Sequence, residues 1–398
     1  MGNYEWFTVP QNIYQGSGSI QVIPEILKKE RWKKVLIVCG PTLLKTGVIG
    51  RFEELLKETE CEYRIFSDVK PNPLSEDIEQ IGVPMYREMN ADVMLAIGGG
   101  STMDSAKGIA IIGDSDKTIF DIAGVMGKYP PHEPLGWKTY PIIAVPTTCG
   151  TGSETTRNAV ISLPDDRKLI PVHDCILPSY AVCDPELLAT QPRHVAAASA
   201  MDALVQAVEG LVSRAATDFA HMCGLHAAEL IGPVIRAYVD DPGNPVYADA
   251  MSKGCMYAGI CWNNSWPAQN HGCNHPMTEI LHISHGDSCA IVMPWFVEYN
   301  GEACRHDFWK VYNCMVPEDR RVHEENFHPA MLVEEFKDLN RYLGISAGKM
   351  MTEAGCTEEI CRRMAEPFMN MATYPVPTDR EQMCSAFIDM MKGKYDAG

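Results

Sequence analysis

Residues 92–107 read Asp-Val-Met-Leu-Ala-Ile-Gly-Gly-Gly-Ser-Thr-Met-Asp-Ser-Ala-Lys, an apolar run followed by three glycines and the start of a helical pattern. Glycines at a turn from strand to helix let backbone amides approach a phosphate, and the helix N-terminus adds partial positive charge. The stretch therefore predicts a buried strand, a helix and, between them, a site for a dinucleotide pyrophosphate. A plain tight turn is the alternative, because the glycines do not form the GxGxxG fingerprint.

The segments on both sides of this stretch alternate between strand and helix patterns. Short apolar runs rich in β-branched residues are typical of parallel strands that are buried on both faces. The expected elements are strands at 34–40, 63–66, 92–97 and 141–146, helices at 49–59 and 75–89, a Gly-rich hairpin-like stretch at 13–20 and a hairpin at 159–172.

Only helical patterns follow Asp184-Pro185, which marks a plausible domain boundary. Alternating strands and helices followed by helices alone indicate an α/β nucleotide-binding domain and an all-α domain. We place these domains at 1–186 and 187–398.

The loop after the strand at 141–146 is rich in hydroxyl side chains and glycine. Residues 147–154 read Thr-Thr-Cys-Gly-Thr-Gly-Ser-Glu, which suits a polar ligand. A purely structural turn explains the same residue types and stays open as an alternative.

A cluster of histidines is the second chemical signal. His271 and His275 are four apart, so on a helix they share one face, and His285 can return a third imidazole to the same place. Converging imidazoles favour a divalent metal, which usually also takes a carboxylate. Asp202 is the best candidate, because an unpaired carboxylate is costly to bury in the apolar helical run at 195–212. Surface or core histidines are the alternative for an HxxxH pair.

Composition restricts the class of protein. The formal net charge is −18, and the pI near 5.1 argues against a nucleic-acid partner, which would require a basic face. The chain has no run of about 18 apolar residues and no signal-peptide pattern, so we expect a cytoplasmic protein without a membrane partner. The 15 cysteines form no CxxC pair and are odd in number, which favours reduced thiols.

Several motifs occur in a fixed order along the chain: Val69-Lys70-Pro71-Asn72-Pro73, Gly98-Gly99-Gly100-Ser101 with Asp104 and Lys107, Pro146 to Glu154, Asp202-Ala203-Leu204, and His271-x3-His275-Pro276 with His285-Gly286. In this order they resemble the iron-containing (group III) alcohol dehydrogenase family almost from end to end. The resemblance implies an N-terminal Rossmann-like domain and a C-terminal helical domain, with cofactor and metal facing each other across a cleft.

The resemblance also implies roles for individual residues. The metal ligands would be Asp202, His271 and His285, and His275 would lie near the nicotinamide as a proton-relay candidate. Gly98, Gly99 and Ser101 would hold the pyrophosphate. The full set of residues expected at NAD or NADP is Gly40, Asn72, Gly98, Gly99, Ser101, Asp104, Thr147, Thr148, Thr151 and Lys168.

Two positions depart from the family pattern. Gln206 stands where the family usually has a fourth ligand, a histidine, and an amide oxygen binds Fe²⁺ or Zn²⁺ more weakly than imidazole does. We keep Gln206 as a weak metal ligand beside three strong ones. Gly40 stands where the family usually has an Asp that binds the adenosine ribose, so the charge that would repel a 2′-phosphate is missing and NADP becomes acceptable.

The segment before His271 differs as well. Residues 261–270 include Trp262 and Gln269, which would add aromatic and amide surface to a substrate pocket and favour a polar substrate. The alternative is that this segment serves helix packing.

The leading interpretation is an NAD(P)-dependent, metal-assisted alcohol dehydrogenase that works as an aldehyde reductase on small substrates, polar ones included. Fe²⁺ or Zn²⁺ would polarise the substrate oxygen during hydride transfer. We also expect a homo-oligomer, a dimer. The alternatives are a metal-independent reductase of the maleylacetate reductase type, a dehydroquinate synthase-like lyase, and a catalytically inactive homologue retained as a binding subunit.

Overall fold

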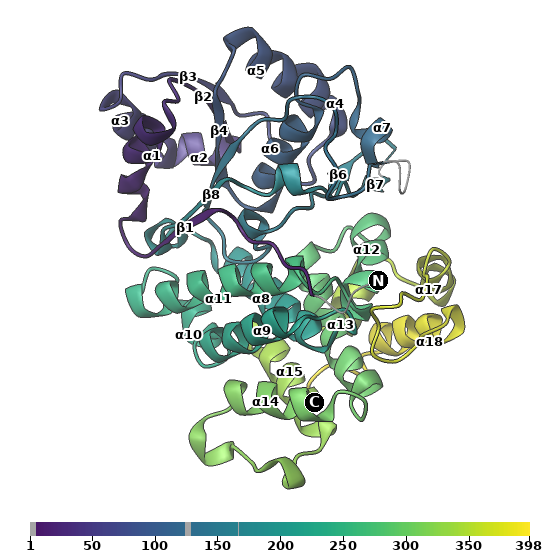
Figure 1. Cartoon of the computed structure of the whole chain (residues 1–398). Helices are drawn as coiled ribbons and strands as arrows, with labels where there is room; N and C mark the ends of the chain where they lie inside the picture. Colours follow the sequence, from purple (N-terminus) through teal and green to yellow (C-terminus); the bar gives the residue numbers. More distant parts are fainter. Residues whose placement is uncertain (1–4, 124–128, 166) are drawn as a thin grey trace. The chain divides into compact units, whose positions relative to one another are not determined.

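The computed structural model describes residues 5–123, 129–165 and 167–398, and the chain forms two compact units (Figure 1). The α/β unit consists of Val9–Thr148 and Gly152–Leu188, and the helical unit runs from Ala189 to the end of the chain. The expected boundary after residue 186 lies close to this division. However, Cys149–Thr151 and residues 5–8 group with the helices, which the sequence analysis did not predict.

Contacts explain why the short segment at 149–151 belongs to the helical unit. The Cys149 thiol donates to the Tyr238 hydroxyl at 3.1 Å. A Cβ on Gly150 would lie 3.1 Å from the backbone of Ser199, so glycine permits the close approach.

The α/β unit contains a six-stranded parallel sheet with the order β1-β8-β5-β4-β2-β3. The four strands predicted from the apolar runs are confirmed. The strands are β1 (Asn12–Gln15), β2 (Lys34–Cys39), β3 (Glu62–Phe66), β4 (Val93–Gly98), β5 (Ile142–Pro146) and β8 (Tyr180–Cys183).

The hairpin-like reading of residues 13–20 is wrong. Residues 12–15 form β1, which pairs in parallel with the distant β8, and a 3-10 turn over Ser19–Val22 follows. The hairpin at 159–172 is confirmed, because β6 (Ile161–Ser162) and β7 (Lys168–Leu169) pair in antiparallel orientation.

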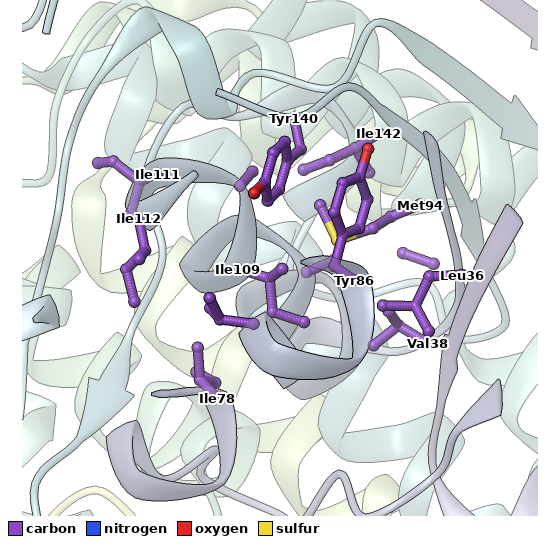
Figure 2. Packing of buried hydrophobic residues seen from close by; sticks show 14 of the residues in the cluster. Leu36, Val38, Ile78, Tyr86, Met94, Ile109, Ile111, Ile112, Tyr140 and Ile142 are labelled. Atoms are coloured by element: carbon purple, nitrogen blue, oxygen red, sulfur yellow. The ribbon is translucent and has the colours of Figure 1, made fainter. Parts of the chain in front are cut away.

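Alternate side chains of the central strands enter two separate cores, as the two-residue period of a strand requires. Val35, Ile37 and Leu95 pack with α1 (Ile23–Glu30) and α3 (Val48–Lys57) on one face. Leu36, Val38, Met94 and Ile142 face the other side and pack with α5 (Val83–Met89) and α6 (Gly100–Ile112), where the rings of Tyr86 and Tyr140 stack at 3.8 Å (Figure 2).

The helix expected at 75–89 is interrupted. It divides into α4 (Ser75–Asp77), a π-helical turn (Ile78–Gly82) and α5. Pro84 lies at the start of α5 and has no backbone N–H, so the regular hydrogen-bond ladder cannot pass through it. Two short helices, α2 (Pro41–Lys45) and α7 (Ile119–Ala123), complete the helices that precede Ala189.

Among the described residues, no strand follows β8, as the sequence predicts. The helical unit contains α8 (Arg193–Val212), α9 (Asp218–Ile231), α10 (Ile235–Asp240), α11 (Pro245–Asn263), α12 (Gln269–Ile280), α13 (His285–Asn300), α14 (Arg305–Met315), α15 (Pro329–Leu343), α16 (Ala347–Glu353), α17 (Glu358–Ala365) and α18 (Arg380–Met391).

Helix α8 lies at the centre of the helical unit and packs against α9, α11 and α13. Of the helices in the described ranges, α8 is the one that is long and apolar enough to cross a membrane, but 83% of its apolar window is buried inside the structure. This burial is typical of a core helix. All fifteen cysteines of the chain are free thiols in the structure.

Candidate metal centre and nucleotide site

Three helices of the helical unit carry the predicted metal ligands. Asp202 comes from the middle of α8, His271 from the start of α12, and His285 from the first position of α13. Helix α13 begins there because Ser284 caps it and accepts a hydrogen bond from the Asp287 amide.

Gly286 brings the beginning of α13 against α8. A Cβ at this position would lie 2.0 Å from the carbonyl oxygen of Ala198, so only glycine fits. This contact is the reason that an imidazole at 285 reaches the carboxylate on α8.

The three predicted ligands converge on one point, together with a sulfur that the sequence analysis missed. Both His271 Nε2 and His285 Nε2 lie 3.5 Å from Asp202 Oδ1. Cys289 Sγ lies 3.9 Å from that oxygen, 3.7 Å from His271 Nε2 and 3.8 Å from His285 Nε2. All four ligand atoms lie within 4.8 Å of one another.

The electrostatics of this cluster favour positive charge at its centre. Burial raises the pKa of Asp202, but the imidazoles of His285 and His271 outweigh it and hold that pKa below its usual range. Burial likewise opposes ionisation of Cys289, and the same imidazoles lower its pKa. In return, Cys289 and Asp202 overcome burial and raise the pKa of His285 to about 10. A divalent cation would satisfy both anions and leave the imidazoles neutral.

Glu209 is a second residue that the sequence analysis missed. It is fully buried, and its carboxylate accepts hydrogen bonds from His271 Nδ1 and, at 3.2 Å, from the His271 amide. An imidazole that donates through Nδ1 leaves its Nε2 lone pair for a metal, and such carboxylate partners orient metal-binding histidines. Helical spacing was the available signal, because Glu209 follows Asp202 by two turns on α8.

Gln206 lies beside the cluster and contacts Asp202. Its Nε2 donates to Asp202 Oδ1 at 3.2 Å, and its buried Oε1 has no hydrogen-bond partner among the residues that the structure describes. In this arrangement the amide nitrogen, which cannot bind a metal, faces the carboxylate. The role of Gln206 as a weak ligand stays a prediction.

Trp262 and His275 border the cluster. The Trp262 ring lies 4.3 Å from the His271 ring, centroid to centroid, and the His275 ring lies 6.1 Å from that of His285. Both side chains are half-buried, so they retain an exposed part that a substrate can contact.

Gln269 differs from Trp262 and His275, because its side-chain amide forms hydrogen bonds with other residues of the protein. It is fully buried, donates to Val376 O at 2.6 Å and to Asn300 Oδ1 at 3.2 Å, and accepts from Asn300 Nδ2 at 3.3 Å. This network corrects the substrate role expected for Gln269 and fits the helix-packing alternative.

The donor set fits a divalent metal of the Fe²⁺ or Zn²⁺ type. Carboxylate, imidazole and thiolate are the ligands of such ions, and the buried cluster of opposite charges would otherwise be costly. Asp202, His271 and His285 would hold the ion, with Glu209 orienting His271.

The α/β unit contains the expected phosphate site at the carboxyl end of β4. A Cβ on Gly98 would lie 2.2 Å from Thr102 Oγ1, and one on Gly99 would lie 2.9 Å from Thr148 Oγ1. The backbone therefore turns too closely for any larger residue, and α6 starts directly afterwards with Gly99 as its N-cap. Such a helix start offers free amide donors and partial positive charge to a phosphate.

The topology of the sheet indicates the same position for the nucleotide site. The chain passes from β2 to β3 on one side and then to β4 on the other side of β2. Ligands of open parallel sheets bind at such a reversal, outside the carboxyl ends of the two strands. Gly40 and Gly98 occupy those two ends.

The other predicted cofactor residues are distributed as follows. The Thr147 amide donates to Gly98 O at 3.0 Å, so Thr147 and Thr148 adjoin the glycine turn. Ser101 lies in the first turn of α6. Asn72 is an exposed turn residue with φ 56°, and Lys168 lies in β7. Thr151 groups with the helical unit.

Asp104 is half-buried and has a structural role, while its expected cofactor contact stays a prediction. Its Oδ1 accepts from Ser153 Oγ at 3.2 Å and its Oδ2 from the Val160 amide at 3.0 Å. The same network contains Lys107, which is fully buried and donates to Ser153 Oγ at 2.7 Å. Burial lowers the pKa of Lys107 to about 8. Both residues thus fasten the segment after the threonine loop to α6.

The α/β unit has a parallel sheet with a glycine turn at its topological switch point, and the helical unit has a buried cluster of residues that can bind a metal. Together these features are typical of nucleotide-dependent metalloenzymes. The family model for "Iron-containing alcohol dehydrogenase" matches residues 10–185, and the model for "Fe-containing alcohol dehydrogenase family, C-terminal" matches residues 196–391. The chain belongs to the iron-containing alcohol dehydrogenase family, and it is an oxidoreductase that interconverts alcohols and aldehydes.

Individual relatives cover most of the chain. It is 30% identical to long-chain-alcohol dehydrogenase 1 of Geobacillus thermodenitrificans over 77% of this chain and 76% of the relative. It is 29% identical to lactaldehyde reductase of Escherichia coli K12 over 83% of this chain and 84% of the relative. The crystal structure of sulfoacetaldehyde reductase from Bifidobacterium kashiwanohense in complex with NAD⁺ matches with a TM-score of 0.86 and 25% identity over 98% of this chain and 99% of that chain.

Proposed function

We propose that this enzyme reduces small polar aldehydes, chiefly hydroxyaldehydes, with NADH or NADPH, and oxidises the corresponding alcohols. The observation that carries the proposal is the convergence of Asp202, His271 and His285 on one buried point of the helical unit. A divalent ion held there supplies a Lewis acid that polarises the substrate oxygen.

The chain's own residues divide the remaining work. Glu209 keeps His271 in the tautomer that a metal ligand requires. His275 is half-buried, and an imidazole titrates near neutral pH, so His275 is our candidate to carry the alcohol proton to solvent. The Trp262 ring packs beside the His271 ring and offers an aromatic surface to the substrate.

The proposed substrate class and the proposed choice of nucleotide are each supported by separate observations. One of the relatives is a lactaldehyde reductase, and lactaldehyde is a hydroxyaldehyde. For the nucleotide, Gly40 at the end of β2 offers no carboxylate against a 2′-phosphate, so we propose that both NADH and NADPH are accepted. The complex of the sulfoacetaldehyde reductase contains NAD⁺.

The test compares lactaldehyde with propanal, which lacks only the hydroxyl group, using NADH and NADPH in parallel. One additional hydrogen bond stabilises by about 0.5–1.5 kcal/mol, so we expect kcat/KM to favour lactaldehyde about threefold to tenfold. A preference for propanal would contradict the polar-substrate assignment. Rejection of NADPH would contradict the proposed dual use of nucleotides.

Cellular location and assembly belong to the same proposal. The free state of all fifteen cysteines supports a reducing, cytoplasmic environment. Sedimentation of the purified protein would test the proposed homodimer.

A further inference from the structure

We propose that Cys289 is a fourth metal ligand, which takes the coordination role that Gln206 does not fill, and that the resulting site selects Zn²⁺ over Fe²⁺. This inference rests on the proposed function, because it concerns the same metal centre.

The distances between the four ligand atoms support a tetrahedral metal site. Tetrahedral Zn²⁺ with ordinary bond lengths to oxygen, nitrogen and sulfur requires its ligand atoms to be about 3.3–3.6 Å apart. Asp202 Oδ1 lies 3.5 Å from each imidazole nitrogen, and Cys289 Sγ lies 3.7–3.9 Å from the other three atoms, so these five distances are close to the edges of such a tetrahedron. The four atoms lie within 4.8 Å of one another, and contraction around an ion would bring them to bonding distance.

Helix geometry and hydrogen bonds hold the sulfur of Cys289 in place. His285 and Cys289 are four residues apart on α13, so both side chains project from one face toward α8 and α12. Cys289 is fully buried, and Asn274 Nδ2 on α12 donates a hydrogen bond to its sulfur at 2.9 Å. Asn270 Nδ2 donates to the Cys289 carbonyl at 3.0 Å and fastens the backbone. Hydrogen bonds of this kind orient ligands around metals.

The surroundings distinguish Cys289 from an ordinary buried cysteine. Cys261 is equally buried, but its sulfur packs against the backbone of Gly210 and Gly224, where a Cβ would lie 2.5 Å and 2.8 Å away. Cys261 therefore fills space between helices. The sulfur of Cys289 instead faces a carboxylate oxygen and two imidazole nitrogens.

The chemistry of the donors also favours Cys289 as a ligand. Gln206 directs its amide nitrogen toward Asp202, which leaves the α8 side of the cluster with one good donor. A thiolate supplies the missing anionic ligand, and it is a soft donor that favours Zn²⁺, whereas a site of only oxygen and nitrogen donors also accommodates Fe²⁺. With four protein ligands, a substrate oxygen would enter as the fifth, as catalytic zinc allows.

The test is X-ray absorption at the zinc edge of the unmutated, zinc-loaded enzyme. We expect one sulfur scatterer at about 2.3 Å in addition to nitrogen and oxygen. A bound metal without a sulfur scatterer would overturn this inference and leave the proposed function intact. Failure of the protein to bind any metal would overturn both.

Variants provide the second readout, by competition with a zinc-binding dye. Loss of an outer partner costs about 10- to 100-fold in metal affinity, so Cys289→Ala, which removes a ligand, should weaken zinc binding by about 100-fold or more. Cys273→Ala is the matched control, because Cys273 is a buried thiol on α12 outside the four-ligand cluster. Equal zinc affinity in the two variants would overturn the inference. If Cys289→Ala does not fold, the absorption spectrum of the unmutated protein still decides.

Discussion

The metal cluster is made of side chains, whereas the glycine turn after β4 is made of backbone. Asp202, His271 and His285 come from three helices and reach one point because Gly286 lets α13 touch α8. At Gly98 and Gly99 the useful groups are amides, and the requirement is the absence of a side chain. The first site should therefore fail when a donor is removed, and the second when an atom is added.

The largest effect is expected for His271→Ala, which removes a donor. The metal should be lost, and kcat/KM should fall by about 10³-fold, since Lewis-acid assistance contributes several kcal/mol. Metal content and turnover are measured together. His282→Ala, an exposed histidine between the two ligands, is the control and should change neither. Unchanged turnover in His271→Ala would show that the enzyme is a metal-independent reductase.

Gly98→Ala should have the next largest effect, because it adds an atom to the backbone site. Its Cβ would lie 2.2 Å from Thr102 Oγ1, so the turn must distort. We expect the free energy of unfolding to fall by about 1–3 kcal/mol and NADH affinity to fall with it, measured by denaturation and by fluorescence titration. Gly50→Ala in α3 meets no atom within 4 Å and serves as the control. Equal NADH affinity in both variants would show that the turn does not bind the nucleotide.

Gly40→Asp differs from Gly98→Ala, because it adds a side chain at a position in the nucleotide site where there is space. Gly40 has an extended backbone with φ −85°, and a Cβ would meet only Val69 O at 3.9 Å. The new carboxylate should disfavour NADPH relative to NADH by about 1–3 kcal/mol without unfolding the protein. The ratio of kcat/KM values for the two nucleotides is the measurement, and an unchanged ratio would remove Gly40 from the ribose site.

Gln206→His should have the smallest effect. It restores an imidazole beside a cluster that already has enough donors, so we expect metal affinity to rise by about tenfold or less. The preference for lactaldehyde over propanal should narrow, because the added ring occupies room near the substrate. Metal dissociation rates and the two kcat/KM values test this; if neither changes, Gln206 is a packing residue.

Local patterns predicted the parts of the fold that depend on neighbouring residues. The apolar runs of β2 to β5 and the turn at Gly98 are visible in short windows of sequence. The parallel pairing of β1 with β8 was missed because strand pairing across the whole unit leaves no local signal. The interruption of the helix expected at 75–89 was missed, although a proline inside a helical pattern indicates a break.

In the candidate site, too, only the residues with a local sequence signal could be predicted. His271 and His285 stand out as imidazoles with a regular spacing, and burial of Asp202 in an apolar helix marks it. Cys289 and Glu209 were missed, although each lies on the same helical face as a predicted ligand, because a thiol among fifteen and a carboxylate among many are not distinctive. Only the packing of α8, α12 and α13 shows which ones matter.

In the proposed mechanism, Asp202, His271 and His285 hold a metal that the reaction needs. The most direct measurement is the metal content of the purified enzyme, followed by aldehyde reduction before and after complete chelation. We expect a divalent metal in stoichiometric amount with the chain, loss of turnover when the metal is removed, and recovery of turnover when Zn²⁺ is returned. Full turnover in a protein without bound metal would contradict it.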